Sequence, residues 1–349
     1  MSKTKIKNPI IGILISPKES RKEYIQAYTP FINNQKFTLI VFNSKNIDWE
    51  KNNINGITFI NGEQVEITLP FPRVVYNRLS TTNSNLMKRF EKYIGLNKCF
   101  NYISKFSKWK VYNTLKDKGF EEYLPKTYLL KEINIIDILM KYTSIYLKPS
   151  YGQLGENVYK LSMTSDRLIN LYYHSTRAKE TFKNNNELNR MLTELVGKKE
   201  FIVQQEIPMV SLNKGYFDIR VLIQKNINGN WEVTSIVSRV TNKFFNNTSL
   251  YEKVVLTEDI LDEFNSIDKV KTILKLKKLS IQVAKTLESS FGHIGELSVD
   301  YGISSTGDLK IIEINGQPQK KIYKFLKNKK QHDNAYIRPI EYAYYLSRK

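Results

Sequence analysis

The chain has 349 residues, of which 41% are hydrophobic, and its 54 lysines and arginines against 34 acidic residues give a formal net charge of +20. This apolar content excludes a disordered chain, and the length indicates two or three domains. Apolar stretches fall short of the roughly 18 to 20 residues of a membrane-spanning helix, so we expect no membrane span. The single cysteine, Cys99, excludes an internal disulfide and a cysteine-based zinc site.

Histidine and charge narrow the chemistry further. His174, His293 and His332 lie far apart in the sequence and form no metal-ligand pattern, so histidine-based metal chemistry is not expected. The positive charge favours an anionic partner, which could be a nucleic acid, a nucleotide, an acidic metabolite or an acidic cell-envelope polymer. Alternatively, the many lysines, asparagines and isoleucines merely reflect an AT-rich genome.

The first hundred residues predict a small α/β domain. The apolar run at residues 10–15 is too short for the core of a signal peptide, and no small-residue cleavage site follows it. We therefore predict a buried first strand and a cytoplasmic protein. Strands at 37–42 and 73–76 and a helix at 84–94 continue the alternation, which is typical of an α/β unit over residues 1–105.

Two further units are predicted, at residues 106–205 and 206–349. The earlier one begins with a helix at 108–115, and strands are predicted at residues 127–130, 144–149, 158–161 and 201–207. The later one contains a hairpin whose strands flank Asn228-Gly229-Asn230, a strong turn signal. Its predicted elements are strands at 217–224 and 231–240, a long helix at 268–290, and a second hairpin of strands at 296–301 and 309–314.

The second hairpin carries three oxygen-bearing side chains. Asp300 ends one strand, while Glu313 and Asn315 lie two residues apart on the other and therefore face the same side. Antiparallel pairing brings Asp300 close to them. Two carboxylates and an amide oxygen form a hard site that suits Mg²⁺ on nucleotide phosphates. The alternative is an ordinary hairpin with polar residues at its exposed end.

A lysine and two glycines form a second candidate element. Lys148 ends a buried strand, and Gly152 and Gly155 follow in a loop. The lysine can neutralise a phosphate, and glycines let backbone amides approach phosphate oxygens closely. The segment is not a Walker A loop, because Gly-x4-Gly-Lys-Ser/Thr does not occur in the chain. Taken alone, the pattern also fits an ordinary turn.

The earlier hairpin contains the third candidate element. Arg220 shares a strand face with Asp218, and Arg239 lies on the partner strand. Two converging arginines suit a phosphoryl group or a developing oxyanion. The alternative is a surface salt-bridge ladder across the hairpin.

The order of these elements resembles the ATP-grasp superfamily, which includes D-alanine–D-alanine ligase and glutathione synthetase. The closest resemblance is to the YheC/YheD family of endospore coat-associated ATP-grasp proteins, on the strength of residues 217–225, the following Gly-x-Trp, and Glu-Ile-Asn at 313–315. The likeness covers roughly residues 106–318. It implies an α/β (α+β) fold in which an N-terminal α/β domain precedes two α+β subdomains that grip ATP, the lid at 106–205 and the C-terminal subdomain at 206–349.

Carried over residue by residue, the resemblance implies a nucleotide site. Lys108 and Lys148 would contact the α- and β-phosphates, and the loop that holds Gly152 and Gly155 would close to exclude water. A hinge would read the adenine edge with its backbone and place Glu206 or its neighbour near the ribose. The hinge residues are Gln204, Gln205, Glu206 and Ile207. Asp218 would be a further residue beside the nucleotide.

The resemblance also implies a reaction. Arg220 and Arg239 would hold the γ-phosphate and an acylphosphate intermediate. One or two Mg²⁺ ions, with Mn²⁺ as an alternative, would be ligated by the three residues Asp300, Glu313 and Asn315. The implied function is a carboxylate–amine ligase that acts on an unidentified carboxylate and an amine such as an amino acid or peptide. The alternatives are an ATP-binding structural protein of the spore coat without turnover, and a small-molecule kinase on the same fold.

Three positions depart from the family pattern. Ser107 stands where an aspartate often precedes the first lysine. Only Asn247-Thr-Ser-Leu represents the usual Asn-Leu-x-x-Gly-Gly, and Gly316-Gln-Pro318 follows the last metal ligand. Because these changes fall beside the expected site, the resemblance does not transfer a substrate.

The C-terminal run at 319–330 interleaves lysines with aromatic residues. One interpretation is an electrostatic platform for an anionic polymer or a nucleic acid. The other is a solvated amphipathic helix that packs Ile322, Phe325 and Leu326 against the core.

Overall fold

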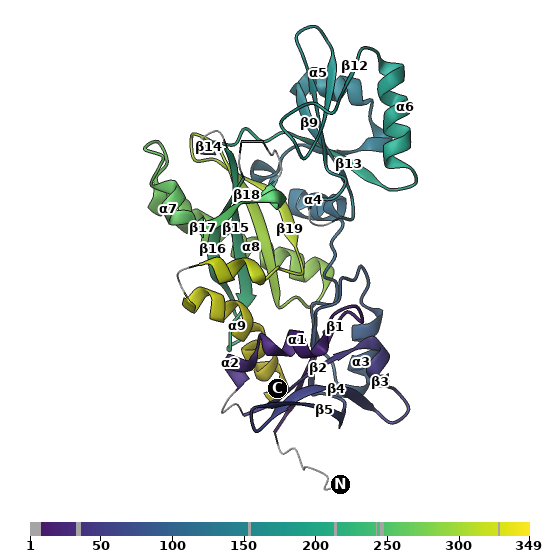
Figure 1. The fold of residues 1–349 in the computed structure, drawn as a ribbon, viewed down its shortest axis with the longest axis vertical. Coiled ribbons are helices and arrows are strands. Elements are labelled where there is room, and N and C mark those ends of the chain that lie inside the picture. The colour runs from purple at the N-terminus through teal and green to yellow at the C-terminus, as the bar shows by residue number, and fades with distance from the viewer. Residues whose placement is uncertain are drawn as a thin grey trace.

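The computed structural model describes residues 8–32, 36–152, 155–212, 215–241, 243–244, 248–326 and 329–349. These residues form three β-sheets with helices around them, so the predicted mixed α/β architecture is confirmed. The sheets follow one another along the long axis of the molecule in Figure 1, with the first sheet at the bottom, the third in the middle and the second at the top.

The first sheet has a parallel centre and an antiparallel edge. Its order is β3-β4-β2-β1-β6-β7, with β5 paired to β4, and the predicted first strand, β1, lies between β2 and β6. The β4–β5 hairpin was not predicted, although its turn, Asn61-Gly62, has positive φ at both residues, as two-residue hairpins require. The strands are β1 (Ile10–Ile15), β2 (Thr38–Asn43), β3 (Ile47–Asp48), β4 (Asn53–Ile60), β5 (Glu63–Pro70), β6 (Val74–Asn77) and β7 (Cys99–Phe100), and the helices are α1 (Arg21–Gln26), α2 (Thr29–Ile32) and α3 (Asn85–Ile94).

The second sheet is antiparallel and has the order β12-β11-β10-β9-β13-β8. Its core is a separate apolar cluster formed by its strands and two helices. The strands are β8 (Thr127–Leu129), β9 (Ser144–Pro149), β10 (Tyr159–Met163), β11 (Ile169–Tyr173), β12 (Glu180–Phe182) and β13 (Phe201–Gln205), and the helices are α5 (Ile135–Tyr142) and α6 (Asn185–Val196).

The third sheet is also antiparallel, with the order β17-β16-β15-β18-β19 and β14 paired to β15. Helix α4 (Lys108–Asp117) contacts β8 of the second sheet as well as α8 and β19, so it joins the two units. The remaining elements are β14 (Ser211–Leu212), β15 (Gly215–Lys225), β16 (Trp231–Val240), β17 (Lys253–Leu256), β18 (Glu296–Ile303), β19 (Leu309–Asn315), α7 (Thr257–Leu261), α8 (Lys269–Phe291) and α9 (Lys329–Arg348).

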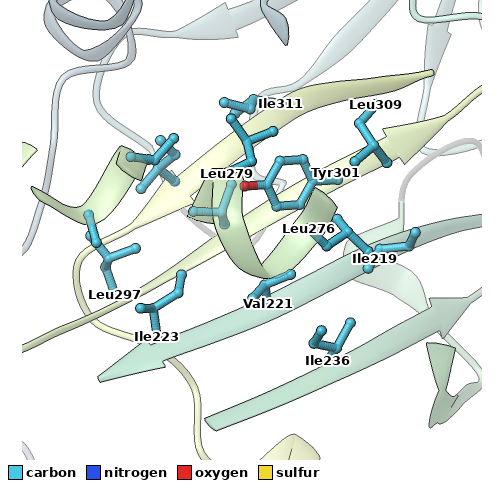
Figure 2. Close-up of a cluster of buried hydrophobic side chains, with 14 of the residues drawn as sticks. Ile219, Val221, Ile223, Ile236, Leu276, Leu279, Leu297, Tyr301, Leu309 and Ile311 are labelled. Atoms are coloured by element: carbon cyan, nitrogen blue, oxygen red, sulfur yellow. The ribbon is translucent and has the colours of Figure 1, made fainter. Parts of the chain in front are cut away.

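One face of the third sheet is apolar and packs against α8. Figure 2 shows the aliphatic side chains of β15 and the aromatic ring of Tyr301 on β18 against Leu276 and Leu279 of the helix. Successive side chains of a strand point to opposite faces. The residues between these apolar positions, such as Arg220 and Asp300, therefore face the other side of the sheet, and that side carries the candidate site.

Helix α9 packs on the opposite side of the third sheet and also on the first sheet. Ala335 and Ile340 share one apolar cluster with Leu222 of β15 and with Ile11 and Val74 of the first sheet. The C-terminal helix thus fixes the first unit against the third. The division at residues 105 and 205 stays a proposal, and α9 belongs to both of the units it contacts.

The run that precedes α9 packs only in part as expected. Ile322 is buried and Leu326 packs against the same cluster as α9, but Phe325 is 69% exposed. Lys320 of the same run is also buried, at 5% exposed. Among the described residues, the helices are all too short or too polar to span a bilayer, as predicted.

We expect Leu276→Ala to lower the free energy of unfolding by about 2–5 kcal/mol, because it leaves a cavity beneath the third sheet. Urea unfolding measures the loss. The control is Leu274→Ala on the same helix, where the side chain is 60% exposed, and its effect should stay within about 0.5 kcal/mol. Equal losses in the two variants would contradict the packing of α8.

Candidate functional site

The polar face of the third sheet brings the predicted arginines and carboxylates together. Asp218 pairs across the hairpin with Arg239, and Arg220 pairs with Asp300 on β18. Asp300 is in turn opposite Glu313 on β19. Directly opposed residues of antiparallel strands lie on the same face. Strand register therefore gathers these five side chains into one row across four strands.

Both arginines are held in forked ion pairs. The Nε and Nη2 atoms of Arg220 each lie 2.7 Å from a carboxylate oxygen of Asp300. Arg239 donates from Nε to Asp218 at 2.9 Å, and its Nη2 donates to Asp218 and, at 2.9 Å, to Asp300. A salt-bridge ladder thus crosses the hairpin and extends to a third strand, but it is buried and does not lie on the surface. Such forked pairs fix the planes of the guanidinium groups.

These ion pairs are deeply buried. Asp218, Arg220, Arg239 and Asp300 are each at most 6% exposed. Burial alone would raise the pKa of Asp300, but Arg220 and Arg239 outweigh it and hold that pKa below its usual range. Two carboxylates and two guanidinium groups balance in charge, so the cluster stays ionised inside the protein.

The three predicted metal ligands lie together at the end of this row. The Asn315 amide is 3.5 Å from Asp300 Oδ2, and Glu313 is cross-strand from Asp300. Their carboxylate and amide oxygens are the donors that Mg²⁺ prefers, so the donor set fits the ion. No group of three or more His, Cys, Asp or Glu that could hold a metal occurs among the described residues.

The two predicted phosphate-binding lysines approach the same place from above the sheet. Lys108, at the start of α4, lies 3.0 Å from Glu313 and 3.3 Å from the carbonyl oxygen of Gly152. Lys148, on β9, donates to the Gln204 side chain at 2.6 Å. Burial lowers the pKa of Lys148 to about 8; the Glu313 carboxylate opposes this shift and the Lys108 ammonium adds to it.

Ser107 has a structural role that the sequence did not indicate. Its hydroxyl caps α4 by accepting from the backbone N–H of Lys110 at 3.2 Å, and it lies 2.9 Å from the Ser150 hydroxyl. The backbone N–H of Lys108 donates to the backbone carbonyl oxygen of Ser150 at 2.8 Å. Serine at this position therefore ties the lysine to the loop after β9, and it is a favoured helix cap.

The predicted hinge is divided in the structure. Gln204 lines the cleft described below, whereas Gln205, Glu206 and Ile207 are not among the described residues that line it. Glu206 lies 2.6 Å from Lys160 of the second sheet. Ile207 lies close to Gly302 of β18, where a β-carbon would be 3.3 Å from it. The hinge segment thus connects the second sheet to the third.

A cleft of about 840 Å³ opens between the three units. Its lining includes Lys108, Arg220, Arg239 and Asn315 at one end and, at the other, residues of α1, Arg78 directly after β6, and the segment before α9. A smaller pocket of about 60 Å³ adjoins it, and its lining includes the candidate site residues Lys108, Lys148, Gly152, Gly155, Asp218, Arg239 and Glu313. The predicted lysines, glycines and arginines therefore lie where the two cavities adjoin, together with Glu313 and Asn315, whereas Gln205, Glu206 and Ile207 lie outside both.

Two parts of the prediction fall outside the described residues. The loop from Gly152 to Gly155 includes residues 153–154, and Asn247 lies within 245–247. The neighbouring Thr248 is described, and its hydroxyl donates to Asp218 at 2.7 Å.

Arg78 and Lys320 line the cleft but were not predicted as site residues. Arg78 directly follows β6, at the carboxyl edge of the parallel strands, which is where α/β sheets bind ligands. That position was a usable signal. Lys320 was visible only as one of many lysines in the C-terminal run.

The family model described as YheC/D-like ATP-grasp matches residues 97–346. The chain belongs to the YheC/D-like ATP-grasp family. Endospore coat-associated protein YheD of Bacillus subtilis (strain 168) is 28% identical over 328 residues, which are 88% of this chain and 70% of YheD. Endospore coat-associated protein YheC of the same organism is 22% identical over 244 residues, or 68% of this chain and 67% of YheC. The predicted resemblance is therefore confirmed.

Solved structures share the ATP-grasp fold. The VanG D-Ala:D-Ser ligase from Enterococcus faecalis is 14% identical with a TM-score of 0.58, over 97% of this chain and 98% of that one. N5-carboxyaminoimidazole synthetase from Staphylococcus aureus, complexed with ADP, is 12% identical with a TM-score of 0.54, over 89% of this chain and 71% of that one. At such identities the likeness establishes the fold of this YheC/D-like protein.

We expect Arg239→Met to lower the free energy of unfolding by about 3–5 kcal/mol, because it leaves buried carboxylates without their partner. Arg190→Met is the control, since Arg190 pairs with Glu194 at 3.4 Å with both side chains more than 70% exposed, and it should cost less than about 1 kcal/mol. Guanidinium unfolding distinguishes the two. A small loss for Arg239→Met would mean that the buried network is not ionised.

Proposed function

We propose that this protein is an ATP-dependent ligase that activates a carboxylate as an acylphosphate and joins it to an amine. The observation that carries the proposal is the convergence of two lysines and two arginines, from three separate segments, around oxygen ligands at one cleft. This arrangement provides what phosphoryl transfer requires, namely positioning and neutralisation of charge.

The cleft has a place for the base of the nucleotide. Next to the lysines, its wall is apolar and comprises Leu115, Leu124, Pro125, Ile202 and Ile311. The side-chain amide of Gln204 stands among them and supplies polar atoms. Nucleotide pockets commonly combine apolar walls with a few orienting polar groups. We assign this part of the cleft to adenine and the adjoining small pocket to the phosphates.

The ion-binding part of the proposal rests on Asp300, Glu313 and Asn315. Bound there, Mg²⁺ would neutralise charge on the ATP phosphates. The proposal is for one or two Mg²⁺ ions, with Mn²⁺ as the alternative ion. Asp300 is shared with Arg220 and Arg239, so the same carboxylate also orients the arginines toward the phosphoryl group.

The proposed chemistry uses the charges that the cleft provides. A substrate carboxylate attacks the γ-phosphorus, which releases ADP and forms an acylphosphate. A neutral amine then attacks the acyl carbon, phosphate leaves, and the amide forms with loss of a proton. Arg220 and Arg239 stabilise the oxyanion of the second step. Among the described residues that line the two cavities, none is His or Cys, and this sequence of steps requires neither.

The identities of the carboxylate and amine are not transferred from any relative. Two relatives are named endospore coat-associated proteins, and spore association of this chain is part of the proposal. The test is release of ADP and phosphate from Mg²⁺-ATP in the presence of amino acids, short peptides and acidic polymers, with mass spectrometry to detect a new amide.

Glu313→Ala should reduce acceptor-dependent ADP release by about a hundredfold or more, because it removes an ion ligand. The control is Glu121→Ala, which breaks a surface pair with Lys126 at 2.6 Å and should leave turnover unchanged. Tight ATP binding without turnover would instead indicate a structural protein. Phosphate transfer to a hydroxyl would indicate a kinase. Absence of ATP binding would contradict the ligase, the structural protein and the kinase alike.

ATP affinity should fall as the pH rises through about 8. Lys148 has a pKa of about 8 in the free protein, so above this value it loses the proton that pairs with a phosphate. The dissociation constant should then increase by up to about tenfold per pH unit. Lys148→Arg keeps its charge across this range and should bind ATP with a flat profile between pH 7 and 9. Calorimetric titration measures both, and identical profiles would contradict the role of Lys148.

A further inference from the structure

A second cationic centre lies at the far end of the same cleft. Glu296 on β18 is fully buried and accepts hydrogen bonds from Arg78 at 2.6 Å and from the side chain of Gln224 at 2.9 Å. Lys320 lies 3.3 Å from the same carboxylate and donates to the Tyr76 hydroxyl at 2.8 Å. Arg78 and Lys320 both line the cleft. The centre therefore joins the first sheet, the third sheet and the segment before α9.

This centre is not balanced in charge. Two cations, Arg78 and Lys320, share the single carboxylate of Glu296. The two cations are 8% and 5% exposed respectively. Burying an uncompensated charge is costly unless a counter-ion joins it. The row at Asp300, with two carboxylates for two arginines, has no such excess.

The pKa of Lys320 is lowered at this centre, chiefly by burial. Burial lowers it to about 7, Glu296 opposes the shift, and Arg78 adds to it. Three tyrosine rings surround the ammonium group, those of Tyr76, Tyr336 and Tyr28, with centroids 5.1, 5.5 and 6.0 Å away. Because Lys320 also lines the cleft, an anion can approach the ammonium group from there. An anion bound there would favour the charged lysine.

More basic groups continue along the lining. Lys105 lines the cleft and is half-buried, and in the described part of the chain no carboxylate lies within ion-pair distance of it. Glu19 and Glu23 line the opposite rim, on and beside α1. A ligand that suits this end carries an anion toward Lys320 and can present an amide or amine to the glutamates.

The strand sets the spacing between the two ends. Glu296 and Asp300 lie four residues apart on β18 and face the same side, a separation of about 13 Å at roughly 3.3 Å per residue. An extended peptide of about three to four residues covers that distance. A reactive carboxylate beside Arg220 and a second anion beside Lys320 would therefore belong to one short chain.

We propose that the carboxylate substrate is a short peptide-like dianion, whose second anionic group binds beside Lys320, Arg78 and Lys105 at the far end of the cleft. This inference rests on the proposed function, because the phosphate end of the cleft fixes where the reactive carboxylate lies. It adds the substrate class, which the comparisons leave open.

The matched probes are the peptides acetyl-Glu-Ala-Ala and acetyl-Gln-Ala-Ala, which differ in one charge. With Mg²⁺-ADP present, calorimetry on the full chain should give about tenfold or more tighter binding of the Glu peptide. In turnover, the Glu peptide should have the lower KM for ADP release. Equal binding of the two peptides, or binding of neither, would overturn the proposal.

Two variants test the residues. Lys320→Met should remove the preference for Glu over Gln and keep the thermal midpoint equal or higher, because Glu296 and Arg78 then balance. Lys105→Ala, which breaks no ion pair, should weaken the preference without affecting folding. A preference unchanged in both variants would overturn the assignment.

The two proposals fail separately. Selective binding of the Glu peptide without any ADP release would keep this subsite and remove the ligase. ADP release with equal KM for both peptides would keep the ligase and remove the subsite.

Discussion

The alternation of side chains along β15 and β18 determines how the rest of the molecule is built. One set of alternate residues, such as Val221 and Tyr301, is apolar and packs on α8. The other set includes Arg220, Asp300 and Glu296 and faces the cleft. Because a shift of one residue in register would exchange the two faces, the same apolar packing that stabilises the sheet also places the charged residues. Stability and chemistry therefore depend on one register.

The parts of the charged face differ in whether their cations and carboxylates match in number. At Asp300, guanidinium groups and carboxylates match in number, so this part is rigid and ionised without a ligand. Lys148, by contrast, has a neutral amide as its hydrogen-bond partner, and Lys320 shares its carboxylate with Arg78. Positive charge is thus left over at the two ends where anions are proposed to bind. Preorganised groups of this kind need little rearrangement when a ligand arrives.

Local sequence patterns predicted the strands and hairpins of the site well, because these elements depend on residues that lie close together in the sequence. Asp300, Glu313 and Asn315 needed only a hairpin to meet, and β18 and β19 provide it. Arg78 and Lys320 were not predicted as site residues because their contacts with Glu296 are not local. Arg78 is 218 residues from Glu296 in the sequence, and Lys320 is 24 residues from it. Contacts over such separations leave no short spacing in the sequence. The β4–β5 hairpin was missed for another reason, since its Asn61-Gly62 signal was present and unused.

Helix α9 explains why the far end of the cleft depends on the whole chain. It packs at once on the first sheet and on the polar side of the third, so it holds Arg78, which follows β6, against Glu296 of β18. Tyr336 of the same helix closes the ring of tyrosines around Lys320. A shortened chain without α9 would keep the β18–β19 hairpin of the proposed ion site, whose contacts are local, but would separate the residues of the cationic centre. The proposed nucleotide site and the proposed substrate subsite thus have different structural supports.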